Sequence, residues 1–288
     1  MDKSIGLSNY FVFEFCTHLR EEEKSQATIE KYERDVRKFL AFVAQNSHSI
    51  DELSKEIVLE YKEKLLAEYE VNSVNSMLAA TNNYLRFIGK RECSVRQMKI
   101  QRKVFLEEGK CISVEEAKKI LLTAEKNGKI RTQIMIETIC STGIRVSELA
   151  FFTVKKIKKG IIQIHNKGKF RVIMLTKELR NKLLRYARMQ SIVQGPIFIT
   201  RTGGVVDRSN FWKEIKEICK VAGVKLTKGF PHNFRHLFAR CFYEVDKDIV
   251  NLAAVLGHSN IETTRIYTMV SYVNIAQQLD KLRSVFKE

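Results

Sequence analysis

Proline is scarce in this sequence, since only Pro196 and Pro231 occur among 288 residues. Proline interrupts helices because it lacks an amide donor and its ring clashes with the preceding turn, so its scarcity permits long helices. Also missing is any run of roughly 18 apolar residues, the length that a membrane-spanning helix needs. The short apolar stretch from Tyr10 to Phe15 follows an acidic Asp2, unlike a signal peptide. We therefore expect a soluble, cytoplasmic protein without a membrane partner.

Cysteine pairs with metal-binding or redox spacing are absent as well. The six cysteines, at positions 16, 93, 111, 140, 219 and 241, include no Cys-x-x-Cys pair. They also do not form the dense framework of a short secreted domain. We expect reduced thiols within the core and no disulfides.

Acidic residues are fewer than basic residues in this chain. The chain has 50 Lys and Arg against 33 Asp and Glu, a net charge of +17. Residues 1–104 hold 17 basic and 16 acidic side chains, so the remainder, with 33 against 17, carries +16 of that charge. Concentrated positive charge attracts phosphate groups regardless of sequence, and salt weakens the attraction. The second part of the chain either faces a polyanion or simply has a basic, solvated surface.

The first 90 residues predict a helical domain. Apolar side chains recur every three or four residues in three stretches, Ser25 to Gln45, Leu53 to Tyr69 and Val74 to Ile88. From about Arg91 the periodicity fades and charges become dense, which predicts a basic interdomain linker over residues 91–110. Ser113 and Glu116 then have the spacing of a capping box at a helix start. A second domain is expected over residues 111–288.

The sequence pattern of the second domain predicts helices around a small sheet. Helical patterns cover residues 113–139, 177–190, 209–222 and 232–244. Between Thr153 and Leu175 the apolar period changes to two, and the turn residues Asn166-Lys167-Gly168-Lys169 stand in that stretch. We expect two or three antiparallel strands there. The fold class is therefore mainly α with a small antiparallel β-sheet.

Three short motifs carry the residues suited to chemistry. They are Ser141-Thr142-Gly143-Ile144-Arg145-Val146-Ser147-Glu148-Leu149, Pro231-His232-Asn233-Phe234-Arg235-His236, and the stretch from Leu256 to Tyr267, in which Tyr267 follows His258 by nine residues. In this order they resemble the tyrosine recombinases, the phage integrase family, and among them the compact Xer-like or transposon-type members. The resemblance implies a helical core-binding (SAM-like) DNA-binding domain followed by a mixed α/β catalytic domain.

The resemblance also implies a site that attacks a DNA phosphate. Tyr267 would be the nucleophile and would form a 3′-phosphotyrosyl intermediate. A phenol with an ordinary pKa near 10 needs neighbours that take its proton and bind the phosphate. Arg145 and Arg235 would bind phosphate oxygens with guanidinium groups that stay charged. His232 would help to move the tyrosine proton, and His258 would contact the phosphate.

A proton donor for the departing 5′-oxygen completes the set. The family uses a lysine at a β-hairpin turn, and this sequence offers Lys167 and Lys169 there. Lys167 directly precedes a glycine and is our assignment, with Lys169 as the alternative. A compact ammonium group suits proton transfer, whereas the permanently charged Arg171 suits holding. Glu148 is expected to be a structural partner of Arg145 rather than a catalyst.

Histidine spacing raises a metal-dependent alternative. His232 and His236 are four residues apart, which can chelate zinc on a helix, and His258 is a candidate third ligand. Asn233, however, stands where a His-Glu-x-x-His zinc protease has its glutamate. We expect no metal and no cofactor, because a phosphotyrosyl ester retains the energy of the broken bond. For His236 we expect a buried, hydrogen-bonding role.

We therefore expect a site-specific DNA recombinase that cleaves and rejoins strands of double-stranded DNA. We expect it to act as a homo-oligomer, a tetrameric synapse, and to be associated with the nucleoid. One alternative is a type IB topoisomerase that relaxes supercoils; another is a DNA-binding regulator without activity. The lack of a long insertion argues against the first, and the complete set of six side chains argues against the second. The resemblance leaves open a second recombinase or an accessory protein.

Beyond Tyr267, apolar residues recur with helical spacing from Tyr272 to Phe286. This pattern predicts a C-terminal helix in the second domain. Such a helix packs against its own domain or, as the resemblance favours, docks into a neighbouring protomer.

Overall fold

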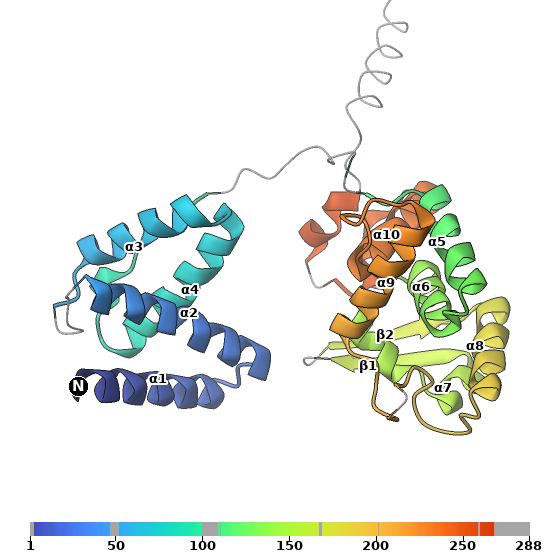
Figure 1. The fold of residues 1–288 in the computed structure, drawn as a ribbon, viewed down its shortest axis with the longest axis horizontal. Helices are drawn as coiled ribbons and strands as arrows, with labels where there is room; N and C mark the ends of the chain where they lie inside the picture. Colours follow the sequence, from blue (N-terminus) through green and yellow to red (C-terminus); the bar gives the residue numbers. More distant parts are fainter. Residues whose placement is uncertain are drawn as a thin grey trace, which may run out of the picture. The chain divides into compact units, whose positions relative to one another are not determined.

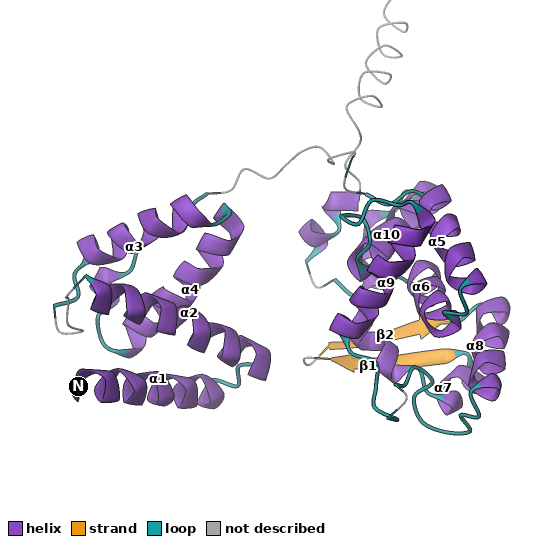
Figure 2. Ribbon diagram, in the orientation of Figure 1, coloured by secondary structure: helices purple, strands orange, loops and turns teal. Residues whose placement is uncertain are grey.

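The computed structural model describes residues 3–46, 52–99, 109, 111–166, 169–200, 202–258 and 260–267. The chain divides into two compact units, residues 1–102 and residues 103–288 (Figure 1). Both are mainly helical, and the strands of the described part belong to the second unit (Figure 2). No helix in the described ranges is long and apolar enough to cross a membrane. Lys167 and the predicted C-terminal helix lie outside the described residues.

The first unit is a bundle of helices. In chain order they are α1 (Lys3–Glu21), α2 (Gln26–Gln45), α3 (Lys55–Glu68), α4 (Val71–Phe87) and the 3-10 helix η1 (Arg91–Cys93). The three helices predicted from apolar spacing are confirmed, with ends within a few residues of those expected. α1 was not delimited from the sequence, but it buries Val12, Phe15 and Leu19 on one face. Phe15 meets Tyr84 of α4 edge to face, with ring centroids 5.4 Å apart.

Two asparagines of α4 hold the segment that follows the bundle. The side-chain amide of Asn82 exchanges two hydrogen bonds with the backbone of Val95, at 2.8 and 3.0 Å. Asn75 does the same with the backbone of Met98, at 2.9 and 2.8 Å. Cys93 and Val95 are buried in the same core. Residues 91–98, which we had assigned to the linker, therefore pack as part of the first unit, because these side chains give their backbone groups partners.

The second unit places helices around one β-hairpin. Its elements are α5 (Val114–Lys126), α6 (Ile130–Thr142), η2 (Val146–Phe151), α7 (Val154–Lys159), β1 (Ile161–Asn166), β2 (Lys169–Met174), α8 (Lys177–Met189), α9 (Arg208–Ala222), α10 (Pro231–Asp246), α11 (Ile249–Leu256), η3 (Ile261–Thr263) and η4 (Arg265–Tyr267). Figure 1 shows α5, α6, α9 and α10 gathered on one side of the hairpin and the short α7 on the other. The predicted fold class, mainly α with a small antiparallel sheet, is confirmed.

The hairpin follows the predicted alternation, with one correction. β1 and β2 pair in antiparallel register from Ile161 with Met174 to Asn166 with Lys169. The expected stretch of strand began too early, because residues 154–159 form α7. Thr153 caps that helix by accepting a hydrogen bond from the Lys156 amide, and the left-handed Gly160 ends it. Two strands remain in the described part of this stretch.

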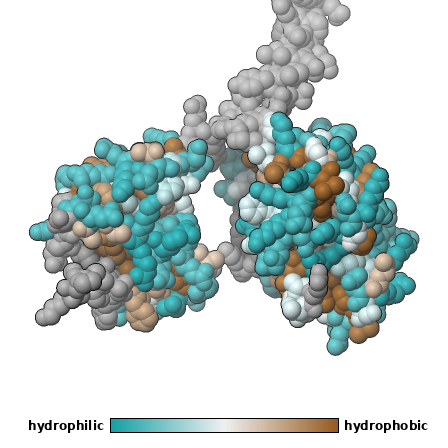
Figure 3. Space-filling view, in the orientation of Figure 1, coloured by the Kyte–Doolittle hydropathy of each residue, from teal (hydrophilic) through white to brown (hydrophobic). Residues whose placement is uncertain are grey.

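Apolar side chains are directed into a separate core in each unit. On the face drawn in Figure 3, hydrophilic residues cover most of the surface. The predicted capping box closes the start of α5: Ser113 N donates to Glu116 Oε2 at 2.9 Å, and Glu116 N donates to Ser113 Oγ at 3.1 Å. Lys228 Nζ also donates to Glu116 Oε1 at 2.8 Å, which fixes the approach to α10.

Gly143 allows α6 to end directly against α10. Its φ of 61° is left-handed, and a Cβ there would lie 2.3 Å from the ring of Phe238 on α10. Both the backbone conformation and the close approach require glycine. The chain can then leave α6 and enter η2 immediately beside α10.

Replacing Gly143 with alanine should destabilise the second unit more than the same change at Gly128. Gly128 has a similar φ of 66° but no atom within 4 Å of its missing Cβ. We expect Gly128→Ala to cost about 1–2 kcal/mol from the left-handed backbone, and Gly143→Ala a further ~1–3 kcal/mol from overpacking. Urea unfolding of the full chain measures both, and equal losses would contradict the packing role of Gly143.

Candidate active site

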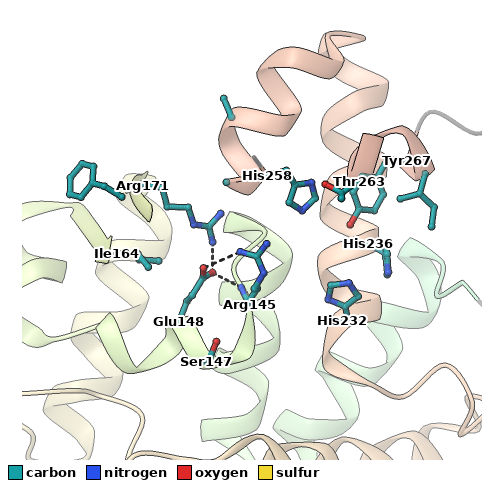
Figure 4. A pocket seen from close by; sticks show the side chains of 14 residues that line it. Arg145, Ser147, Glu148, Ile164, Arg171, His232, His236, His258, Thr263 and Tyr267 are labelled. Atoms are coloured by element: carbon teal, nitrogen blue, oxygen red, sulfur yellow. Dashed lines mark hydrogen bonds and ion pairs between the residues drawn. The ribbon is translucent and has the colours of Figure 1, made fainter. Parts of the chain in front are cut away.

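One pocket of the second unit gathers side chains from all three sequence motifs (Figure 4). Its lining comprises Arg145, Ser147, Glu148, Ile164, Phe170, Arg171, His232, His236, Ala254, Gly257, His258, Thr263, Ile266 and Tyr267. Four of the predicted site residues, Arg145, His232, His258 and Tyr267, are therefore brought together. Arg235 is not a lining residue: it is 1% exposed and lies behind the pocket wall.

Glu148 holds two arginines at the pocket wall. The carboxylate is 2% exposed, and Oε2 accepts a hydrogen bond from the Arg145 backbone amide at 2.6 Å. Its Oε1 accepts from Arg145 Nη1 at 3.3 Å, and Oε2 also accepts from Arg171 Nη2. Figure 4 shows both side chains directed at this carboxylate. Glu148 is thus the structural partner of Arg145 that we expected, and it binds Arg171 as well.

Arg171 is a pocket residue that the sequence left without a defined partner. It lies opposite buried Ile164 in the hairpin, and its Nη1 donates to the Val255 carbonyl of α11 at 2.9 Å. Gly257, with a φ of 65°, leaves room for it, since a Cβ there would lie 2.6 Å from Arg171 Cδ. The sequence did contain one signal for this role: Arg171 occupies a position in an alternating strand whose side chain is expected to point inward, where a charged residue is unusual. It joins the hairpin to the end of α11.

Arg235 is a buried cation held by helix ends. Its Nη1 donates to the carbonyl of Gly143, after α6, and its Nη2 donates to the carbonyl of Leu256, at the end of α11, at 2.8 Å. Carbonyls at helix C-termini carry partial negative charge and have no partner within the helix. Burial, then repulsion from Arg145 and Arg171, lowers the pKa of Arg235 to about 10. The guanidinium therefore stays charged at neutral pH.

The histidines of the pocket are neutral at neutral pH. Burial is the main cause that lowers the pKa of His236 to about 4 and that of His258 to about 4; nearby cations add to it. The pKa of His232 is also lowered, by partial burial and then by Arg235 and Arg145. Each ring is therefore neutral near pH 7 and has one nitrogen without a proton. Among the described residues, His236 shows ring contacts rather than the expected hydrogen bond: its ring centroid is 4.5 Å from that of His232.

Tyr267 lies inside this pocket of its own chain. It is 6% exposed, and its ring centroid is 5.1 Å from that of His236 and 6.4 Å from that of His258. Burial raises the pKa of its phenol, while Arg235 and Arg145 oppose the increase. The phenol therefore keeps its proton at neutral pH and needs a base before it can act as a nucleophile.

Two expectations concern groups other than those already placed, the hairpin lysine and a metal ion. Lys167 lies outside the described residues, as does the side chain of Lys169, so both remain predictions. Within the described ranges, no group of three or more His, Cys, Asp or Glu side chains is arranged to hold a metal ion.

Removing the charge of Glu148 should strongly destabilise the second unit. Glu148→Gln leaves Arg171, whose side chain is 10% exposed, without its anionic partner. Breaking one side of a buried pair costs about 3–5 kcal/mol. The control, Glu217→Gln, breaks a pair with Lys129 whose side chains are 67% and 47% exposed, and should change the free energy of unfolding by about 0–1 kcal/mol. Similar losses in urea unfolding would refute the structural role of Glu148.

Both units match one protein family. The phage integrase family matches residues 110–273, and the phage integrase N-terminal SAM-like domain matches residues 12–92. The chain is 30% identical over 292 residues to tyrosine recombinase XerA of Thermococcus kodakarensis, covering 97% of each chain. It is 25% identical over 268 residues to tyrosine recombinase XerD of Vibrio cholerae, covering 88% of this chain and 89% of that one.

Solved structures show the same fold at lower identity. XerH site-specific recombinase bound to difH substrate in a pre-cleavage complex has a TM-score of 0.71 at 21% identity, covering 96% of this chain and 84% of that one. A lambda integrase tetramer bound to a Holliday junction has a TM-score of 0.73 at 14% identity, covering 90% and 76%. The sequence matches over both units decide the identity: the chain belongs to the phage integrase family and is a tyrosine-type site-specific recombinase, similar to the Xer proteins, that cleaves and rejoins DNA.

Proposed function

We propose that Tyr267 is the nucleophile of this recombinase and that it attacks a backbone phosphate of double-stranded DNA. The observation that supports this most directly is the burial of Tyr267 in a pocket with Arg145, His232 and His258 of the same chain. The phenol oxygen forms a bond to phosphorus, the bond from phosphorus to the 5′-oxygen breaks, and a 3′-phosphotyrosyl ester results. Attack by a 5′-hydroxyl reverses these steps and joins the strands.

The charges of the pocket suit a phosphate. Arg145 and Arg171 both bond the buried carboxylate of Glu148, and Arg235 adds a third positive charge close enough to repel them. A bound phosphate supplies negative charge that the protein itself lacks there. Guanidinium groups match phosphate oxygens in pairs, and fixed donors stabilise the charge that grows in the transition state. In this proposal Arg145 contacts the phosphate from the pocket wall. Arg235 and His258 contact it from the side of the protein interior.

A neutral histidine takes the phenol proton. His232 is the assigned acceptor, and its lowered pKa keeps it neutral and able to accept. The ring of His236 lies between those of His232 and Tyr267, in contact with both. His236 therefore either holds Tyr267 in place by packing or passes the phenol proton of Tyr267 to His232. Lys167, as before, is proposed to protonate the departing 5′-oxygen.

The proposed partner is duplex DNA in an assembly of several copies. The second part of the chain carries +16 of the net charge of +17, which favours a polyanion. Related proteins have been crystallised on DNA, lambda integrase both as a dimer on a core site and as a tetramer on a Holliday junction. We propose a tetrameric synapse for this chain by that analogy.

The nucleophile can be tested with a nicked suicide duplex, in which the cut strand is lost and the covalent ester accumulates. The bound sequence is first enriched from random duplexes with the Tyr267→Phe variant. The wild-type chain should then form an adduct in buffer that contains a chelator, whereas Tyr267→Phe should bind the duplex and form none, because it lacks the attacking oxygen. The matched control Tyr243→Phe, in α10, should react like the wild type. An adduct with Tyr267→Phe would place the nucleophile elsewhere.

The leaving-group acid is tested by replacing the bridging 5′-oxygen with sulfur. A thiolate departs without protonation, so the cleavage defect of Lys167→Ala on ordinary DNA should largely vanish on the sulfur substrate. Lys169→Ala serves as the comparison. Rescue of Lys169→Ala but not of Lys167→Ala would transfer the role to Lys169.

A further inference from the structure

His258 stands between two side chains that fix where its proton lies. Its Nε2 atom is 2.9 Å from Arg235 Nη2, and its Nδ1 atom is 2.8 Å from Thr264 Oγ1. Arginine nitrogens only donate hydrogen bonds. Nε2 of the neutral ring therefore accepts from Arg235, and the single ring proton lies on Nδ1, which donates to the Thr264 hydroxyl.

This tautomer has no Nε2 hydrogen to donate to a phosphate oxygen, the role proposed above for His258. In the free protein, adding a second proton to the ring is unfavourable, because burial and the cations of Arg235 and Arg145 hold its pKa at about 4. A ring that stays neutral can present an Nε2 hydrogen to DNA only when its proton lies on the other nitrogen.

Thr264 is suited to that change. Its hydroxyl can donate a hydrogen bond as well as accept one. The residue is 0% exposed, and its backbone is held on both sides: Thr264 N donates to the Ile261 carbonyl at 2.8 Å, and Tyr267 N donates to the Thr264 carbonyl at 2.9 Å. Rotation of one hydroxyl hydrogen thus converts the acceptor into a donor while the backbone keeps its place. A hydrogen on Nε2 would face Arg235 Nη2, which is 2.9 Å away in the free protein, so these two donors must turn apart toward the phosphate.

Building on the proposed function, we propose that Thr264 is a positioning residue that lets His258 exchange tautomers when DNA binds. In the free protein, Nδ1–H donates to Thr264 and Nε2 accepts from Arg235. On binding, Nδ1 releases its proton to water and Nε2 takes one from water, so the ring stays neutral. The Thr264 hydroxyl then donates to Nδ1, and Nε2–H donates to a phosphate oxygen.

The exchange also changes what Arg235 can bind. Once Nε2 of His258 carries a hydrogen, it no longer accepts from Arg235 Nη2, and that N–H becomes available to the same phosphate. Arg235 keeps its bonds to the carbonyls of Gly143 and Leu256. A single hydroxyl rotation thus couples His258 to Arg235. The backbone bond from Tyr267 to Thr264 places the nucleophile next to this exchange.

Nitrogen NMR of the full-length chain labelled with [15N]histidine tests the exchange directly, since protonated and unprotonated ring nitrogens have well-separated shifts. The Tyr267→Phe variant is measured alone and with its duplex, and His258 signals are identified by their loss in His258→Gln. We expect Nδ1 to be protonated in the free chain and Nε2 in the complex. The same tautomer in both samples, or two protonated nitrogens in the complex, would overturn the proposal.

Cleavage rates test whether the hydroxyl matters to the reaction. Thr264→Val keeps the shape but removes the hydroxyl, and should slow adduct formation by about tenfold to a hundredfold with little change in DNA affinity. Thr264→Ser should restore most of the rate. The matched control is Thr138→Val, because Thr138 is also 0% exposed and its hydroxyl donates to the Ile134 carbonyl within α6.

The outcomes separate this proposal from the one on which it rests. A wild-type rate for a folded Thr264→Val chain, with the control also unchanged, contradicts the role of Thr264 alone. A wild-type chain that forms no adduct contradicts the proposed function, while the NMR measurement still decides between the two tautomers. If Thr264→Val unfolds in urea earlier than Thr138→Val, the Thr264→Ser rate and the NMR shifts carry the decision.

Discussion

A guanidinium group with almost no solvent contact is the constraint on which the site depends. Arg235 is 1% exposed, and a buried cation is stable only where nearby groups replace the lost hydration. Here those groups are the carbonyls that follow α6 and end α11, together with His258. The two helices must end where they do for these carbonyls to face the charge. The placement of Arg235 thus fixes the back wall of the pocket.

The remaining cations are balanced only in part, which gives the pocket its chemistry. Glu148 neutralises one charge while it holds both Arg145 and Arg171. Burial and then repulsion from the other arginines lower the pKa of Arg235, and burial followed by the same cations lowers the pKa values of His232 and His258. The site therefore combines positive charge with neutral proton acceptors. In the proposed reaction, a phosphate that enters the site relieves the repulsion, and the phenol of Tyr267 loses its proton to a histidine ring.

Two glycines make this crowding possible. Gly143 and Gly257 both adopt left-handed backbone conformations after helices, and both occupy positions where a Cβ would collide with a neighbour. At Gly143 the neighbour is a ring of α10, and at Gly257 it is Arg171. The helix ends that these glycines form also supply carbonyls to Arg235 and leave room for Arg171.

The sequence by itself determined most of the longer helices, the hairpin, the capping box at Ser113 and the motif order that indicated the family, because these depend on periodicity and short spacings along the chain. Only the tertiary structure decided which groups meet across long separations. Arg235 and Gly143 are 92 residues apart, and Arg171 and Val255 are 84 apart. Residues 154–159 form a helix that is capped at both ends. The alternating pattern of the strand that follows led us to predict strand there instead. The burial of Arg235 depends on how helix ends pack in space, which no spacing along one segment encodes.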